Sequence, residues 1–322
     1  MKRTILVTGA AGFIGSNVID RLLERGDTVV AVDNFTDYYD VSFKEENIAE
    51  HTTHPNYTLY RTDITDMAGM AAIFAAHTFD TVLHLAAQAG VRSSIIDPIT
   101  FVNVNVSGTT ILFELCQKNA VPHVVFASSS SVYGNQEKIP FSEDDSVTAP
   151  ISPYAASKKS AELIAYTFHH LYGMHMTGLR FFTVYGQRGR PDMSPYLFAD
   201  AILHDRPITQ FGDGSTRRDY TYIDDIANGI LAAIEHPLGF EIINLGNSST
   251  ISLQEYIELF EQVIGKKAKI IREPEKPGDV KKTYADIRKA RELLAWQPTT
   301  TLEEGLPQFI EWFKKHRYTP NN

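Results

Sequence analysis

The sequence is poor in cysteine, in long apolar runs and in positive charge. Cys116 is the single cysteine among 322 residues, which excludes an intrachain disulfide and a cysteine-based zinc site and is typical of a reducing compartment. No run of about 18 apolar residues occurs, so we expect no membrane span. Glycines interrupt the apolar stretch near the N-terminus, which therefore does not predict a signal peptide. We expect a soluble, cytoplasmic protein.

Charge and histidine content exclude further classes of partner. The formal net charge is −9, whereas nucleic acids and anionic membranes are bound by clustered Lys and Arg, so we expect neither as a main partner. The eleven histidines show no metal-ligand spacing, and we predict no metal site. The length suits one large domain or two modest ones, which can still carry local basic sites for small anions.

Short apolar runs rich in β-branched residues alternate with helix-length amphipathic segments through the first half of the chain. The expected strands read TILVTG, TVVAVD, YTLYRTD, TVLHLAA, HVVFASS and MTGLRFF, and the expected helices span 13–25, 67–77, 97–120 and 154–172. Continuous apolar strands joined by helices are typical of a parallel sheet covered on both faces, and right-handed crossovers make it doubly wound. The sequence therefore predicts an α/β fold with a doubly wound parallel sheet.

The pattern loosens in the second half, where segments rich in Pro, Gly and charge follow one another. The run FEIINLGN at 240–247 looks like one more strand that returns to the sheet. We predict a first domain of residues 1–180 with a return near 224–247. A smaller, substrate-binding domain is expected to consist of 181–223 and 248–322.

A glycine motif follows the first predicted strand, which runs into GAAGFIG and places Gly9, Gly12 and Gly15 at the turn and the start of the first helix. Glycine lets the backbone approach a pyrophosphate, whose charge meets free N–H groups and the helix dipole in a Rossmann-type site. Asp33 ends the second strand, where its carboxylate can accept both ribose hydroxyls of an adenosine and would repel a 2′-phosphate. Asn34, rather than arginine, follows it, so the pattern favours NAD over NADP. A plain glycine turn with a capping Asp is the alternative.

The remaining residues of the predicted NAD site lie at the ends of neighbouring strands. Asp63 ends the third strand, where its carboxylate can meet the adenine amine. The full set of expected cofactor-binding residues is Gly9, Gly12, Phe13, Ile14, Gly15, Asp33, Asn34, Asp63, Ile64, Leu85, Ala86, Ala87, Tyr154 and Lys158.

Four serines in ASSSSVYG follow the strand HVVF, and SPYAASKKSAE places Tyr154 and Lys158 four residues apart on one face of a predicted helix. A serine-rich strand end is by itself a common turn, and a chain with fifteen tyrosines gives about one such pair by chance. The pair is the only Tyr-x-x-x-Lys in the sequence. Its position after the serines, in a chain with a predicted NAD site, favours a catalytic role.

With these motifs the chain resembles the extended short-chain dehydrogenases/reductases, in their sugar-nucleotide epimerase and dehydratase branch, over essentially its whole length. Ser129 stands where the family has a Ser or Thr shortly before Val-Tyr-Gly. The resemblance implies that Tyr154 is the acid/base, that Lys158 holds the nicotinamide ribose and lowers the pKa of Tyr154, and that Ser129 hydrogen-bonds the reacting oxygen. A cation about 4 Å from the phenol is worth roughly 4 kcal/mol at an effective dielectric of 20. With the charge of the oxidised nicotinamide added, we expect a tyrosinate near neutral pH.

The residues after Ser129 limit the reaction. Related 4,6-dehydratases carry Asp-Glu directly after the Ser or Thr, and nucleotide-sugar decarboxylases place a Glu two residues before the Tyr of Val-Tyr-Gly. Those acids add a second proton transfer, and this chain has Ser130 and Ser131 instead. We expect oxidation of a sugar hydroxyl followed by reduction from the opposite face, which is epimerisation at carbon 4, with Ser129, Ser130 and Ser131 at the substrate.

Arginines gather near the predicted carboxyl edge of the sheet, where ligands bind. RFFTVYGQRGRPDM brings Arg188 and Arg190 there and AGVRSS adds Arg92, although each alone could equally be a solvated surface charge. Together with Thr183 they resemble the motif of uronate 4-epimerases, as does NFTDYYDVSFK. A uronate carboxylate suits a bidentate guanidinium. We expect Thr183, Arg190 and Arg92 to bind a UDP-uronic acid.

A further pair of segments is expected at the diphosphate. RRDYTYIDD resembles the family's diphosphate-binding Arg-Asp-Tyr segment and indicates Arg218. In KPGDV, Asp279 is an expected substrate contact, while Lys276 stands where relatives carry an arginine. The second phosphate contact therefore stays open.

The resemblance implies NAD-dependent interconversion of UDP-glucuronate and UDP-galacturonate through a transient 4-keto intermediate. Two alternatives remain: an epimerase or decarboxylase of another UDP-sugar such as UDP-glucose, and a NAD-binding scaffold without turnover. Apolar faces on the helices 97–120 and 154–172 predict a homodimer through a four-helix contact like that of the family.

Overall fold

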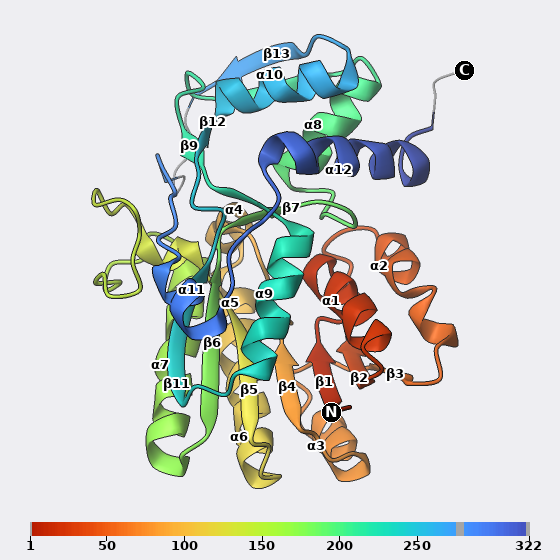
Figure 1. Cartoon of the computed structure of the whole chain (residues 1–322), viewed down its shortest axis with the longest axis vertical. Coiled ribbons are helices and arrows are strands. Elements are labelled where there is room, and N and C mark those ends of the chain that lie inside the picture. Colours follow the sequence, from red (N-terminus) through yellow and green to blue (C-terminus); the bar gives the residue numbers. More distant parts are fainter. Residues whose placement is uncertain (1, 275–279, 320–322) are drawn as a thin grey trace.

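The computed structural model describes residues 2–274 and 280–319. A seven-stranded sheet with the order β11-β6-β5-β4-β1-β2-β3 forms its centre (Figure 1). The strands are β1 (Thr4–Thr8), β2 (Thr28–Asp33), β3 (Tyr57–Arg61), β4 (Thr81–His84), β5 (His123–Ser129), β6 (His175–Phe181) and β11 (Phe240–Leu245). Every neighbouring pair is parallel. The predicted Rossmann-type α/β fold and the returning strand are confirmed.

The strands form because their residues are apolar on both faces. All four residues of β4 and five of the six residues of β2 are buried. Burial on both faces is the pattern of a parallel sheet covered by helices on two sides. Each fully buried Val, Leu or Ile side chain contributes about 1.5–3 kcal/mol, so this central layer supplies much of the stability.

Helices cover both faces of the sheet. One face packs against α1 (Phe13–Glu24), α9 (Ile223–Glu235) and α11 (Arg288–Leu294), and the other against α3 (Met67–Ala76), α6 (Thr109–Lys118) and α7 (Pro153–Tyr172). α7 begins after Ser152, whose hydroxyl accepts a hydrogen bond from the N–H of Ala155, with Pro153 in the first turn. It ends at Gly173, which has a left-handed φ of 67°. These caps fix the length of the helix that carries the predicted catalytic pair.

The predicted helix 97–120 is divided into three parts. α5 (Pro98–Val102) leads into a π-helical turn, η2 (Asn103–Gly108), and then into α6. Over Pro98–Lys118 the segment is long and apolar enough to cross a membrane, judged by length and composition. However, 44% of its most apolar window is buried inside the fold, and the segment packs against α3 and α7. Part of the segment therefore lies in the core, while α5 carries exposed apolar residues such as Ile99.

A smaller unit lies above the carboxyl ends of the strands (Figure 1). It contains α8 (Ser194–Leu203), α10 (Leu253–Ile264) and α12 (Leu302–His316), with the short strands β7 (Thr183–Tyr185), β8 (Pro207–Phe211), β9 (Arg217–Arg218), β10 (Tyr220–Tyr222), β12 (Ile251–Ser252) and β13 (Lys269–Glu273). The strands pair as β10 with β7, β12 with β9 and β13 with β8. The three helices share a core of their own, rich in Tyr and Phe. The unit therefore covers the edge where the strands end.

The expected domain division differs from the structure at one segment. Ala290, Leu294 and Trp296 fall in the predicted second domain, but they join the core formed by α1 and α9 against the sheet. The indole N–H of Trp296 donates a 2.9 Å hydrogen bond to the carbonyl of Asp225 on α9. The apolar side of α11 thus belongs to the sheet, and the other boundaries stay predictions.

Candidate active site

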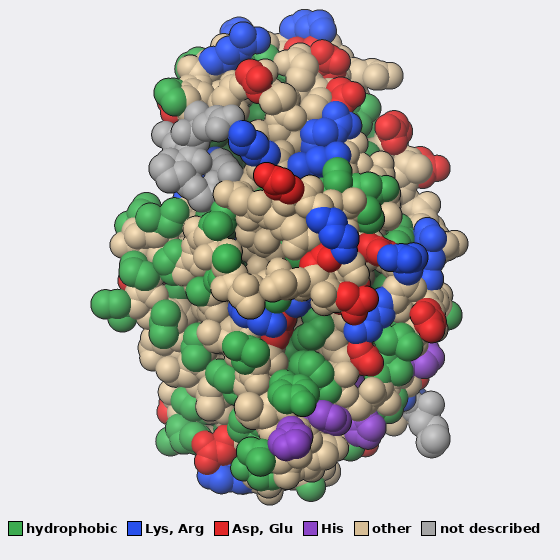
Figure 2. All heavy atoms as spheres, turned by 90° about the vertical axis from the view of Figure 1, so that its left-hand side faces the viewer, with side chains coloured by type: hydrophobic (Ala, Val, Ile, Leu, Met, Phe, Trp, Pro, Cys, Tyr) green, Lys and Arg blue, Asp and Glu red, His purple; other side chains and the backbone are tan. Residues whose placement is uncertain are grey.

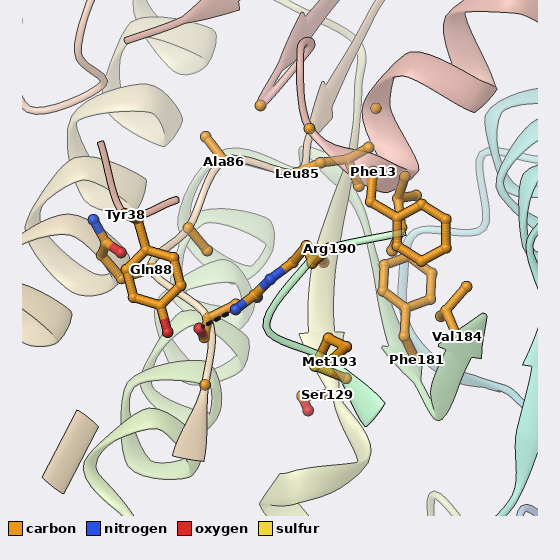
Figure 3. Close-up of a pocket in the computed structure, with 18 of the residues that line it drawn as sticks. Phe13, Tyr38, Leu85, Ala86, Gln88, Ser129, Phe181, Val184, Arg190 and Met193 are labelled. Carbon is orange, nitrogen blue, oxygen red and sulfur yellow. Dashed lines mark hydrogen bonds between the residues drawn. The ribbon is translucent and has the colours of Figure 1, made fainter. Parts of the chain in front are cut away.

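A cavity of about 410 Å³ opens at the carboxyl edge of the sheet, under the smaller unit. Short elements after the strands help to enclose it: α2 (Val41–Ile48), α4 (Val91–Ile96) and η3 (Ser130–Tyr133). Figure 3 shows Phe13 and Phe181 on one side of this cavity, Tyr38 and Gln88 on the other, and Arg190 between them.

Most of the predicted site residues line this cavity. From the predicted NAD site these are Gly9, Gly12, Phe13, Ile14, Gly15, Asp33, Asn34, Asp63, Ile64, Leu85, Ala86 and Ala87. From the predicted catalytic and substrate sites they are Ser129, Ser130, Ser131, Tyr154, Lys158, Thr183 and Arg190. The structure therefore brings residues from both halves of the predicted site into one space.

The glycine turn forms a cradle that side chains would fill. A Cβ on Gly9, which has a φ of +69°, would lie 2.7 Å from the backbone nitrogen of Ala86, and one on Gly15 would lie 2.2 Å from the carbonyl oxygen of Gly9. Gly12 caps α1 without a side-chain hydrogen bond, and the first turn of α1 contains no acidic residue. The N–H groups of that turn are therefore available to an anion. The cradle fits the pyrophosphate of a dinucleotide.

Asp33 at the end of β2 is held by its neighbours. Its Oδ2 accepts from the N–H of Ala11 at 3.1 Å and its Oδ1 from that of Phe35 at 2.9 Å. The buried ammonium of Lys44 lies 3.5 Å from Oδ1 and also lines the cavity. A carboxylate has about four acceptor sites, so Asp33 keeps capacity for ribose hydroxyls. The apolar pattern does not predict α2, and Lys44 is therefore a site residue that sequence reasoning missed.

The predicted adenine contact is fixed by a second small network. Asn34 donates through Nδ2 to Oδ2 of Asp63 at 2.7 Å. The other oxygen of Asp63 accepts from the N–H and the hydroxyl of Thr65 at 2.8 and 2.6 Å. The ends of β2 and β3 are thereby joined beside the cradle.

Ser129, Tyr154 and Lys158 meet where the end of β5 faces α7. The ammonium of Lys158 donates to the carbonyl of Ala127 at 3.0 Å and lies 6.0 Å from the centre of the Tyr154 ring. The Ser129 side chain lies close enough to the phenol of Tyr154 to lower its pKa. The Ser129 hydroxyl also accepts from the N–H of Ser131 at 3.2 Å. The predicted set is assembled, and its catalytic roles stay predictions.

Burial dominates the electrostatics of this set. It raises the pKa of Tyr154 above its usual value, while the Ser129 side chain and the charge of Arg190 act in the opposite direction. Burial also lowers the pKa of Lys158 to about 8. In the structure the charge that opposes burial at Tyr154 is that of Arg190, and the Lys158 ammonium donates to a backbone carbonyl. The expected effect of Lys158 on the pKa of Tyr154 stays a prediction.

Arg190 reaches into the cavity from the segment after β7. Its Nε and Nη2 donate to the Asp192 carboxylate at 2.9 and 2.6 Å, and Nη2 also donates to the carbonyl of Ala89 at 3.0 Å. The guanidinium lies 5.2 Å from the centre of the Tyr38 ring. Within residues 2–274 and 280–319 no bond uses Nη1, so its two hydrogens can serve an anionic ligand near Thr183.

The other two arginines of this group do not line the cavity. Arg188 has a φ of 62° and pairs through Nη1 with Asp20 of α1 at 2.6 Å. Arg92 is exposed on α4, and its guanidinium lies 4.4 Å from the centre of the Phe211 ring on β8. Arg92 therefore lies between the sheet and the smaller unit, and its role at the substrate stays a prediction.

Among the described residues, the predicted diphosphate contact Arg218 lies outside the lining of this cavity. Arg218 of β9 lines a second, polar cavity of about 540 Å³ together with Arg217, Tyr220 and Asn247. Asp279, like Lys276, lies outside the described residues. The contacts of the diphosphate remain predictions.

Asn105 of η2 is a buried polar residue that sequence reasoning missed. Its Oδ1 accepts from the N–H of Gln88 at 2.8 Å, and its Nδ2 donates to the Gln88 carbonyl and to the Ser157 hydroxyl, both at 2.9 Å. Ser157 directly precedes Lys158 in α7. The π-helical turn thus joins the loop after β4 to the helix that carries the predicted catalytic pair.

Tyr38 and Ser93 join the loops on either side of β1. The two hydroxyl oxygens are 2.6 Å apart. Tyr38 follows β2 and Ser93 lies on α4 after β4, and β2 and β4 are the neighbours of β1 in the sheet. Tyr38 also lines the cavity.

The arrangement supports reversible oxidation of an alcohol. A phenol can move the proton, a hydroxyl can bind the oxygen, and a dinucleotide cradle lies in the same cavity. Among the described residues that line the cavity, the carboxylates are Asp33 and Asp63, at the ends of β2 and β3. Ser130 and Ser131 lie beside Ser129 instead, so the described site offers no second acid there.

Comparison with known proteins places these features in a family. A protein-family model described as GDP-mannose 4,6 dehydratase matches residues 6–309. The chain is 48% identical over 312 residues to a UDP-glucuronate 4-epimerase of Thermodesulfobacterium geofontis, covering 97% of this chain and 96% of that relative. It is 43% identical over 329 residues to UDP-glucuronate 4-epimerase 4 of Arabidopsis thaliana, covering 96% and 75%.

Two solved structures are similar over nearly the whole chain. One is the UDP-glucuronic acid 4-epimerase of Bacillus cereus in complex with UDP-glucuronic acid and NAD, with a TM-score of 0.91, 37% identity and coverage of 97% and 99%. The other is a UDP-glucose 4-epimerase of Thermotoga maritima with UDP-glucose, with a TM-score of 0.90, 35% identity and the same coverage. The two neighbours share the fold and differ in the sugar they hold.

Proposed function

The chain belongs to the GDP-mannose 4,6-dehydratase family of extended short-chain dehydrogenases/reductases, and from this premise we propose that it is an NAD-dependent UDP-glucuronate 4-epimerase. It interconverts UDP-glucuronate and UDP-galacturonate. The similarity to the epimerases of T. geofontis and B. cereus supports this substrate. One observation supports epimerisation rather than dehydration. Serines follow Ser129, and no carboxylate lies beside them among the described residues that line the cavity. Loss of water needs a further acid, so family membership alone does not imply a dehydratase.

The described residues fit the cofactor. Gly9, Gly12 and Gly15 would hold the pyrophosphate of NAD against the first turn of α1, and Asp33 would bind the adenosine ribose. NAD bound there would supply the acceptor for the hydride of carbon 4 of the sugar and the donor for its return.

The protein supplies the proton transfer. Tyr154 takes the proton of the 4-hydroxyl while that carbon is oxidised, and gives it back when the ketone is reduced; such a group is worth about 10²- to 10⁴-fold in rate. Ser129 holds the reacting oxygen next to the phenol. Inversion at carbon 4 requires the keto-sugar to present its other face before reduction, so the contacts to the sugar must be strong enough to retain it and must allow it to turn.

NAD is expected to stay bound through many turnovers. Each cycle regenerates its own hydride acceptor, so no external oxidant is consumed. The test is to incubate purified protein with UDP-glucuronate without added cofactor and to separate the products. UDP-galacturonate is expected, and an absolute requirement for added NADP would overturn the proposal.

A UDP-glucose 4-epimerase is the second candidate, favoured by one observation. The Asp192 carboxylate already pairs with Nε and Nη2 of Arg190, which reduces the positive charge offered to a substrate. Supplying UDP-glucose and UDP-glucuronate in parallel decides between the two. Higher kcat/KM for UDP-glucose would replace the uronate assignment.

A homodimer is proposed from an exposed apolar face on α4, α5 and α7. Ile96 and Ile99 are 85% and 80% exposed, and Leu163 and Tyr166 of α7 are 57% and 51% exposed. Figure 2 shows the side of the molecule that carries α7, with hydrophobic side chains gathered over its lower half. Contiguous exposed apolar surface is typical of an interface. The mass in solution tests this: Ile99→Glu should convert a dimer to a monomer, and a monomeric wild type would remove the proposal.

A further inference from the structure

α7 contacts the end of β5 at three successive residues of the strand. The three helix residues are spaced by four, so they lie along one face of α7. Hydrogen bonds join Lys158 to Ala127 at 3.0 Å and Glu162 to Ser128 at 2.6 Å, and the Ser129 side chain lies close enough to Tyr154 to lower its pKa.

Glu162 is the member of this row that does not line the described cavity. Its Oε1 accepts from the Ser128 hydroxyl at 2.6 Å and from Nε of Arg180 at 2.7 Å, and its Oε2 accepts from Nη2 of Arg180 at 2.8 Å and from Lys159 at 3.1 Å. Ser128 and Arg180 are paired directly across β5 and β6. One carboxylate from α7 therefore holds two neighbouring strands at the point where β5 ends.

The ion pair is fully enclosed, since Glu162 and Arg180 are each 2% exposed. Burial tends to raise the pKa of Glu162, but the bonds to Arg180 hold it below its usual value, so the carboxylate stays ionised. Replacing a buried ion pair with apolar residues of similar volume is often neutral or stabilising. A contribution to the free energy of unfolding therefore does not explain why this pair is present. A bidentate pair does fix orientation, which an apolar contact does not.

We propose that Glu162 and Arg180 are positioning residues for the epimerisation: they set α7 against the end of β5 so that Tyr154 and Ser129 act on the same oxygen. The proposal rests on the proposed function. Misplacement of a catalytic group by about 1 Å can cost on the order of 10²-fold in rate. Because neither residue lines the described cavity, their loss should lower kcat and leave substrate binding nearly unchanged.

Two variants test this with different risks to folding. The double variant Glu162→Met with Arg180→Met replaces both charges by long apolar side chains and leaves no charge unpaired. Ser128→Ala keeps the ion pair and removes its link to β5. The matched control is Thr177→Val, because the buried Thr177 hydroxyl bonds His123 at 3.2 Å between the same two strands, away from α7.

Wild type and variants are compared for kcat, KM, bound NAD and thermal midpoint. We expect both test variants to retain NAD and to lose about 10- to 100-fold in kcat, with KM for UDP-glucuronate within about twofold of wild type. Thr177→Val should lose stability and keep kcat. If both test variants fold, bind NAD and keep the kcat of wild type, the ion pair has a structural role only and the proposal is overturned.

A second readout does not depend on turnover. The absorbance of tyrosinate is titrated in each protein and in its Tyr154→Phe derivative, and the difference reports Tyr154 alone. Because the Ser129 side chain lowers the pKa of Tyr154, moving the two side chains apart should shift the titration of Tyr154 to higher pH in both test variants. An unchanged titration contradicts the positioning role. Failure of wild type to convert UDP-glucuronate would instead count against the proposed function, and the titration would still decide this inference.

Discussion

The ammonium of Lys158 donates a 3.0 Å hydrogen bond to the carbonyl oxygen of Ala127 and lies 6.0 Å from the centre of the Tyr154 ring. Lys158 is 6% exposed, and burial lowers its pKa to about 8 from 10.5. The folded protein therefore holds a cation where burial opposes the charge. Such an arrangement costs stability and is typical of functional sites.

Lys158→Met should stabilise the protein while abolishing epimerisation. The depression of the pKa from 10.5 to about 8 corresponds to roughly 3 kcal/mol, which is the upper limit of the gain at neutral pH. Between pH 8 and 10.5 the unfolded chain binds the proton more tightly, so wild-type stability rises with pH and the advantage of the variant shrinks. Urea unfolding across this range measures the difference.

The control for this prediction is Lys267→Met, because the Lys267 side chain is 89% exposed. It should change the free energy of unfolding little at any of these pH values. A Lys158→Met protein that is less stable than wild type at neutral pH would show that the bond to Ala127 outweighs the burial of the charge.

Tyr154→Phe should abolish turnover and leave UDP-sugar binding nearly intact. The change removes the group that moves the proton and little contact in the ground state, so kcat should fall by about 10² to 10⁴. Tyr166→Phe on the same helix is the matched control, since Tyr166 is 51% exposed and lies outside the described cavity lining. Retention of more than about a tenth of kcat in Tyr154→Phe would assign the acid/base to another residue.

Asp33→Ser should relax the choice between NAD and NADP. The carboxylate is expected to bind the ribose and to repel a 2′-phosphate. Its removal leaves the Lys44 ammonium, which lies 3.5 Å from Oδ1 in the wild type, without this counter-charge in the cavity. A hydrogen bond to a charged group is worth about 1.5–3 kcal/mol. Affinity for NAD should therefore fall by about 10- to 100-fold and affinity for NADP should rise. Calorimetric titration of both cofactors into the NAD-free variant measures this.

Adding Lys44→Met to Asp33→Ser provides the control. If the ammonium is what attracts the 2′-phosphate, the double variant should bind NADP as poorly as wild type does. Continued exclusion of NADP by the single variant would show that the loop after β2, rather than charge, rejects the phosphate.

The sheet could be predicted from sequence because each strand is recognisable from its own residues, without knowledge of its contacts with other elements. Runs such as ILVT and HVVF are apolar at consecutive positions, which is compatible only with burial on both faces. The helix at 97–120 was harder, because its π-helical turn depends on the bonds of Asn105 to Gln88 and Ser157, which come from other elements. Periodicity records which face of a helix is apolar and carries no information about such a local change of hydrogen bonding.

The site was predictable where a motif is local in sequence. The glycines and the Tyr-Lys pair stand at fixed spacings on one element, so their geometry follows from the turn or the helix. Lys44 and Glu162 meet their partners across elements, and no spacing in the sequence encodes that contact. Arg188 was expected beside Arg190, but a φ of 62° turns the chain so that its side chain reaches Asp20.

The last prediction concerns carbon dioxide. Once carbon 4 of a uronate is a ketone, the carboxylate lies β to it, and carbon dioxide leaves readily when the breaking bond is perpendicular to the carbonyl plane. An epimerase must keep that bond away from perpendicular while the keto-sugar turns. Thr183 and Arg190 line the cavity, and bonds from two donors fix the orientation of a carboxylate as well as its charge.

Thr183→Val or Arg190→Ala should therefore lose epimerisation and release carbon dioxide and UDP-4-keto-pentose. The cofactor should accumulate as NADH, because the hydride is no longer returned to the sugar. Wild type should give UDP-galacturonate with almost no pentose. Arg188→Ala is the matched control, since this neighbouring arginine pairs with Asp20, and its product ratio should equal that of wild type. Mass spectrometry of the products decides the outcome. If the two variants epimerise UDP-glucuronate normally and release no carbon dioxide, other contacts control the orientation of the carboxylate. Arg92, which is exposed on α4, is then the next residue to substitute.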